Sequence, residues 1–94
     1  MESSLSYSGK TLKEIRVRKG IKLEDVSELT RVSKRQLRNI EEENFSDIPA
    51  RVYFKGFLCS YVRCIGINED EVLSQMIDRF AKWENKVKTL SEEG

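Results

Sequence analysis

The sequence predicts an all-α fold, and composition, periodicity and helix-stop signals each support this. Charged residues make up 35% of the 94 residues and hydrophobic ones 38%, with only five glycines and one proline. That balance is typical of a soluble helical domain rather than of a sheet or a disordered chain. Apolar residues recur at spacings of three and four, and Gly20 and Gly66 interrupt the periodic stretches. We therefore expect one compact domain with a small core.

Five helices are expected within one domain at residues 10–90, after a flexible polar leader at residues 1–9 and before a flexible end at 91–94. Ser33 is expected to cap the third helix in a capping box with Gln36, and Asn44 to end it in a left-handed conformation. Asn68 is expected to cap the fifth. The expected helices span about residues 10–19, 23–30, 34–43, 50–65 and 69–88. The inward positions of the first three are expected at Leu12, Ile15, Val17, Val26, Leu29, Leu37 and Ile40.

A helix-turn-helix motif is predicted at about residues 23–42. Val26, Leu37 and Ile40 have its apolar spacing, with Val32 in the turn and Ser33 opening the second helix. In a DNA-binding protein, the outward side chains of that second helix would enter the major groove. These are Lys34, Arg35, Arg38 and Asn39.

The charge pattern leaves this motif with two open interpretations. Residues 10–40 contain ten basic and four acidic residues, which fits attraction to phosphate. However, Glu41, Glu42 and Glu43 follow at once, and the whole chain carries only +1, whereas DNA-binding domains are normally more basic. The outward face is therefore either a DNA contact or a solvated helix surface.

The predicted helix at 50–65 is apolar over about half its circumference, more than a core-facing stripe needs. Phe54, Leu58, Val62 and Ile65 are expected in the core. A second stripe at the same spacing is a candidate partner surface, formed by Tyr53, Phe57, Tyr61 and Cys64 and bordered by Lys55, Ser60 and Arg63. Gly56, which costs about 1 kcal/mol in a helix interior, suggests the close approach of another helix.

The last helix carries a heptad-like seam of Leu73, Met76, Phe80, Trp83, Val87 and Leu90. The seam is shorter than the three or four heptads that indicate a coiled coil, so packing onto the domain is favoured. Homodimerisation through this seam is the alternative.

Enzyme chemistry is not expected, since the chain has no histidine, the commonest general base. Cys59 and Cys64 would lie about 140° apart on one helix, which disfavours a disulfide between them. Two cysteines without histidine do not make a zinc site, so no metal or cofactor is expected. The N-terminal residues lack the basic start and apolar run of a signal peptide, and no apolar stretch of about 18 residues occurs.

Four segments carry a resemblance to a known family: KGI at 19–21, LEDV at 23–26, SKRQLRNIEE at 33–42 and IPARVYFKGFLCSY at 48–61. They resemble the cytoplasmic helix-turn-helix domain of RodZ, the bacterial cell-shape protein, over about residues 11–73. The aromatic string at 53–61 is its most specific part. The sequence departs from the family pattern at Lys22, Asn39, Glu43 and Cys59.

The resemblance implies a compact five-helix, lambda-repressor-like domain with an extended last helix. It implies that the domain binds the actin-like protein MreB, with partner-contacting aromatics at Phe57 and Tyr61. It also implies a parent protein that continues into a linker, one transmembrane helix and a periplasmic region. The domain would then lie in the cytoplasm, at the inner face of the bacterial membrane.

Overall fold

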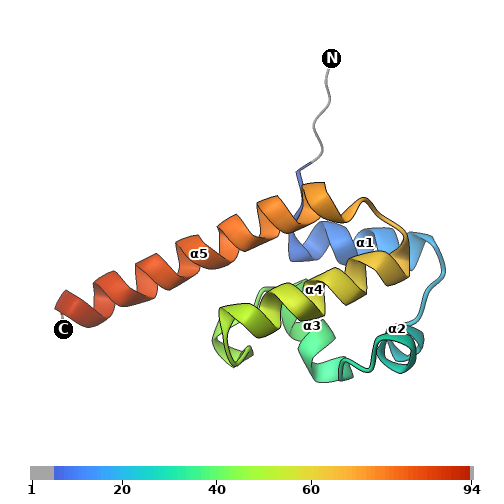
Figure 1. Cartoon of the computed structure of the whole chain (residues 1–94), viewed down its shortest axis with the longest axis horizontal. Coiled ribbons are helices and arrows are strands. Elements are labelled where there is room, and N and C mark those ends of the chain that lie inside the picture. The colour runs from blue at the N-terminus through green and yellow to red at the C-terminus, as the bar shows by residue number, and fades with distance from the viewer. Residues whose placement is uncertain (1–5, 94) are drawn as a thin grey trace, which may run out of the picture.

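The computed structural model describes residues 6–93 and is all-helical there, as predicted (Figure 1). Four helices gather into a compact body, and the fifth packs along it and then extends beyond it as an arm. The elements are α1 (Gly9–Arg18), α2 (Leu23–Thr30), α3 (Lys34–Glu42), the short 3-10 helix η1 (Phe45–Asp47), α4 (Arg51–Ile65) and α5 (Glu69–Glu93). Among the described residues, no helix is both long enough and apolar enough to cross a membrane.

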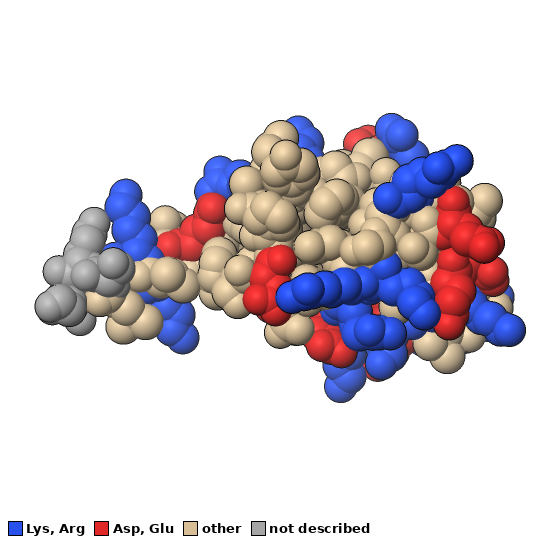
Figure 2. Space-filling model, turned by 90° about the horizontal axis from the view of Figure 1, so that it is seen from below, with Lys and Arg blue, Asp and Glu red and all other residues tan. Residues whose placement is uncertain are grey.

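The side on which α2 and α3 lie carries charges of both signs (Figure 2). Lysine and arginine side chains gather there next to acidic ones, and a broad uncharged area borders them. The face of the helix-turn-helix is therefore electrostatically mixed rather than uniformly basic.

An aromatic cluster joins the arm to the body. Phe45 of η1 contacts Phe54 of α4 and Phe80 of α5, with ring centroids 5.5 and 5.1 Å apart, and Phe54 stacks on Phe80 at 4.7 Å. Such pairs add to the burial of their apolar area. The first half of α5 thus packs onto the domain. Val87 and Leu90, further along the predicted seam, are exposed.

Several helix ends match the sequence signals. The Ser33 hydroxyl accepts a hydrogen bond from the Gln36 N–H at 3.2 Å, although the Gln36 side chain accepts from Asn39 instead of closing the expected capping box. The Asn68 side chain accepts from two N–H groups in the first turn of α5. Gly20 and Gly66 both have positive φ, which glycine adopts without a steric penalty.

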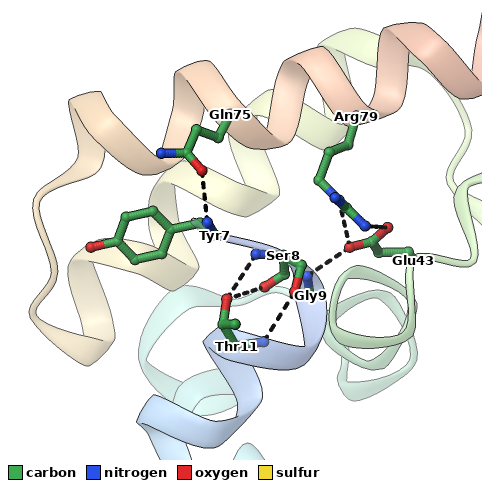
Figure 3. A network of polar contacts seen from close by, with 7 residues as sticks. All are labelled: Tyr7, Ser8, Gly9, Thr11, Glu43, Gln75 and Arg79. Atoms are coloured by element: carbon green, nitrogen blue, oxygen red, sulfur yellow. Dashed lines mark hydrogen bonds and ion pairs between the residues drawn. The ribbon is translucent and has the colours of Figure 1, made fainter. Parts of the chain in front are cut away.

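The end of α3 was predicted wrongly. The left-handed residue is Glu43 (φ 57°), whereas Asn44 has φ −81°. Long-range contacts hold Glu43 in this conformation: its carboxylate accepts a hydrogen bond from the Gly9 N–H at 2.8 Å and two from the Arg79 guanidinium at 2.9 Å (Figure 3).

The predicted flexible leader is also wrong over residues 7–9; residues 1–5 lie outside the described part. Tyr7 is buried, and its N–H donates to the Gln75 side chain at 2.7 Å (Figure 3). Ser8 caps α1 in a capping box with Thr11. At the other end, α5 continues to Glu93, past the predicted end near residue 88, and Gly94 lies outside the described part.

Gly9 permits a close approach of α1 to α3. A Cβ on Gly9 would lie 2.3 Å from the carbonyl oxygen of Ile40 and 2.4 Å from that of Glu41. Real Cβ atoms do not approach backbone oxygens so closely, so only glycine fits here.

Three expectations about packing were wrong. Val17 is 57% exposed and Leu29 is 76% exposed. The buried side of α1 instead includes Arg16, and the buried side of α2 is formed by Leu23 and Val26. Gly56 marks no close helix, because a Cβ there would have no neighbouring atom within 4 Å.

Candidate partner-binding surfaces

The outer face of α4 exposes apolar side chains near its start. Val52 is 72% exposed and Tyr53 is 54% exposed. Phe57, one turn after Tyr53, is half-buried against the core, and the two rings lie 6.0 Å apart. Gly56 lies between them in sequence and leaves the helix surface open. We call Val52, Tyr53, Gly56 and Phe57 the α4 face.

The predicted polar rim surrounds this face only in part. Lys55 and Arg63 are exposed and Ser60 is half-buried. Arg63 pairs with Glu69 at the start of α5, its Nε 2.6 Å from the carboxylate. Hydrogen bonds from Arg63 and from the Cys59 thiol hold the pKa of Glu69 below its ordinary value. Arg63 is thus already paired with a carboxylate, whereas Lys55 forms no ion pair with the side chains of residues 6–90.

Tyr61 does not belong to the exposed surface, contrary to the prediction. Its side chain is fully buried, and its hydroxyl donates to the carboxylate of Glu41. Tyr61 follows Phe54 by seven residues, so the two lie within about 20° of each other around α4 and share its core-facing side. In this conformation Tyr61 cannot touch a partner, and the accessible aromatics are Tyr53 and Phe57.

Glu41 connects three helices through buried polar contacts. It accepts hydrogen bonds from Arg16 on α1, at 2.7 Å from Nε and 3.3 Å from Nη2, in addition to the bond from Tyr61 on α4. Arg16 also donates to the Ile21 carbonyl at 2.8 Å. Burial, followed by the hydrogen bond to Glu41, raises the pKa of the Tyr61 phenol far above its ordinary value. This network fixes α4 against α1 and α3, and so orients the α4 face.

This network was not predicted from the sequence. Glu41 was interpreted as one of three acidic residues that disfavour DNA, and no role was predicted for Arg16. The available signal was weak: Arg16 follows Leu12 by four residues and so shares its inward side. Pairing between residues 25 positions apart cannot be deduced from periodicity.

The outward face of α3 is narrower than predicted. Lys34, Arg35 and Arg38 are exposed as expected, and Lys34 pairs with Glu24 of α2 at 3.4 Å. Asn39, predicted to face outward, is only 5% exposed, and its amide donates to the Gln36 side chain at 3.3 Å. It is buried because α1, α2, α4 and η1 all pack against α3. Arg35 and Arg38 are the cations of this face that form no ion pair within residues 6–90.

Comparison with known proteins places the fold in a family. Residues 11–72 match the profile of a family described as a helix-turn-helix domain. The chain belongs to this helix-turn-helix family. The matched range runs from the first turn of α1 to the first turn of α5 and includes both candidate surfaces, the α4 face and the outward face of α3.

One relative is a protein of Bacillus subtilis (strain 168), the uncharacterized membrane protein YmfM. The two are 30% identical over 53 residues, which cover 56% of this chain and 18% of YmfM. The matched part thus spans less than a fifth of that relative's length. No solved structure gives a significant match.

Proposed function

We propose that this helix-turn-helix domain is the cytoplasmic adaptor of a RodZ-like membrane protein and binds the actin-like protein MreB through the α4 face. The RodZ-like residues at 19–26, 33–42 and 48–61 support the proposal, as does the similarity to a membrane protein. The parent protein would then continue beyond residue 94 into its membrane segment. The structural observation that carries the proposal is the exposed apolar surface of Val52 and Tyr53 beside Phe57.

This surface has the chemistry of an interaction anchor. Aromatic side chains supply large contact areas and lose little conformational freedom on binding, and they dominate many interface energies. Tyr53 and Phe57 lie one turn apart on a helix that the Arg16–Glu41–Tyr61 network holds in place. Their presentation is preorganised, so binding does not have to order a loop.

The test is the affinity of purified MreB for the domain, measured by titration with a fluorescently labelled domain. Truncating a true anchor costs about 2 kcal/mol or more, roughly thirtyfold in affinity. We expect at least that loss for Tyr53→Ala/Phe57→Ala. The matched control, Val87→Ala/Leu90→Ala, removes exposed apolar side chains from the arm of α5 and should bind as wild type does.

Circular dichroism must show that each variant is folded. Full-strength binding by a folded Tyr53→Ala/Phe57→Ala domain would reject the α4 face as the site. Equal losses in both double variants would show that exposed apolar area, rather than this surface, determines the measured affinity.

DNA reading through α3 is the second candidate function, because Arg35 and Arg38 are exposed and form no ion pair within the described chain. This function predicts duplex binding that weakens steeply with salt and is lost in Arg35→Ala/Arg38→Ala. Undetectable or salt-insensitive binding to duplex DNA would rule it out.

A further inference from the structure

A large part of the positive charge of this chain lies in and just after α1. Residues 10–22 contain six basic residues and one acidic residue, a local charge of +5. The remaining eleven basic and fifteen acidic residues carry −4, and the two parts together make the overall +1. A nearly neutral chain therefore has a strongly basic segment here, and residues 31–38, with four basic residues and no acidic one, form a second.

The outer surface of α1 combines unpaired cations with an exposed apolar side chain. Lys10, Lys13 and Arg18 line a shallow depression together with Glu14 and Val17. The three cations form no ion pair with any carboxylate of residues 6–90. We call these five residues the α1 face.

The other cations of α1 have structural roles. Arg16 is buried against Glu41, and the Lys19 ammonium donates to the Ile65 carbonyl at 2.7 Å, next to the end of α4. The cations of the α1 face have no such partner among residues 6–90, so within this part of the chain they remain available for an external one.

We propose that the α1 face docks onto an anionic lipid surface. Lysine and arginine can lay their aliphatic stems along the interface with their charges at the lipid phosphates, while Val17 enters the apolar edge of the headgroup region. The phosphates of a nucleic acid could also pair with the three cations, but a phosphate backbone offers no apolar partner for the exposed Val17. The similarity to the membrane protein YmfM points the same way. The α1 face and the α4 face lie on different helices, so occupation of one does not use the residues of the other.

The expected contact is weak by itself. A lysine or arginine near an anionic leaflet contributes about fivefold in partitioning, so the three cations together contribute on the order of a hundredfold. Such an interaction would not recruit a free domain efficiently. In a membrane-anchored parent, the tether supplies a high effective concentration, and the same contact would set the orientation of the domain.

The test is binding of the chain to vesicles of neutral phosphatidylcholine and to vesicles containing equal amounts of phosphatidylcholine and phosphatidylglycerol. Binding is followed by the attenuation of backbone amide signals in nuclear magnetic resonance, at low and at high salt. We expect attenuation centred on α1, only with phosphatidylglycerol, and lost at high salt. Lys10→Gln/Lys13→Gln/Arg18→Gln should reduce partitioning about a hundredfold, and Val17→Ser severalfold with the charge unchanged.

The matched control is Lys82→Gln/Lys86→Gln/Lys88→Gln, which removes the same charge from α5 and should keep binding. The proposal is overturned if both triple variants lose binding equally, if neutral vesicles bind as well, or if no attenuation occurs at millimolar lipid. Duplex DNA is added in a parallel titration. Attenuation of α1 by DNA alone, with no response to vesicles, would assign the α1 face to nucleic acid instead.

Discussion

Replacing Tyr61 by phenylalanine separates a core role for this residue from a partner-binding role. The substitution keeps the buried ring and removes only the hydroxyl that donates to Glu41. Glu41 retains its two hydrogen bonds from Arg16. If Tyr61 is a core residue, Tyr61→Phe should lower stability without changing the surface that a partner meets.

The size of the effect follows from the hydrogen bond that is lost. A hydrogen bond to a charged group contributes about 1.5–3 kcal/mol, and the carboxylate of Glu41 is too buried for water to replace it freely. We expect a loss of about 2 kcal/mol from a total stability on the order of 5–10 kcal/mol. For a domain of this size, the melting temperature should fall by about 8–16 °C.

Urea denaturation followed by far-ultraviolet circular dichroism measures this loss. Tyr53→Phe is the matched control, because Tyr53 is half-exposed and its hydroxyl forms no hydrogen bond with residues 6–90. The stability of this variant should stay within about 0.5 kcal/mol of wild type. Wild-type stability of Tyr61→Phe would refute the assigned network.

An alkaline titration provides an independent check on Tyr61. Its pKa is raised in the folded state above the ordinary 10.0, so folding favours the protonated phenol. The stability that results from this raised pKa is fully present below about pH 10, and it is lost as the pH rises above that value. In ultraviolet absorbance, ionisation of Tyr61 should therefore coincide with unfolding. Ionisation of all three tyrosines in a still-folded domain would contradict the burial of this one.

Four further predictions concern stability, pH and assembly. Gly56→Ala should raise stability by about 0.5–1 kcal/mol, because the site is helical and open, and a lower unfolding midpoint would contradict it. Gly9→Ala should destabilise the domain by more than about 2 kcal/mol through its backbone clash, and a near-neutral effect in the same urea assay would disprove the close approach. The pKa of Glu69 is lowered in the folded state, so the ionised carboxylate contributes stability above the ordinary pKa of 4.5. This contribution is lost as the pH falls through the pKa of the folded state, and Glu69→Gln should flatten that part of the acid unfolding profile. Sedimentation should give a monomer mass, since Val87 and Leu90 supply far less than the roughly 800 Å² per partner of a stable interface; a dimer abolished by Val87→Ser would show otherwise.

Features with local causes could be predicted from the sequence. The stops at Gly20 and Gly66 depend on single residues that adopt positive φ, and the Ser33 cap depends on neighbours three positions away. The all-α fold, the helix-turn-helix and the packing of Met76 and Phe80 followed from periodicity.

Features that depend on distant partners could not be predicted. Glu43 takes a left-handed conformation because Gly9 and Arg79 bind its carboxylate, across more than 30 positions. On α4, the residues at the edge of the apolar arc were predicted correctly, but which of them are buried was not. A rotation of a few tens of degrees around the helix axis decides whether a side chain at this edge is buried or exposed. Tyr61 faces the core, and Glu41 satisfies its hydroxyl there.

In the proposed function, the α4 face binds MreB and the buried Tyr61 does not. Measuring MreB affinity for Tyr53→Ala/Phe57→Ala beside Tyr61→Phe, at a temperature where both are folded, separates the two residues' roles. We predict at least a thirtyfold loss in the first variant and affinity within about twofold of wild type in the second. The reverse result, with Tyr61→Phe losing binding and the double variant retaining it, would reject the α4 face as the MreB site.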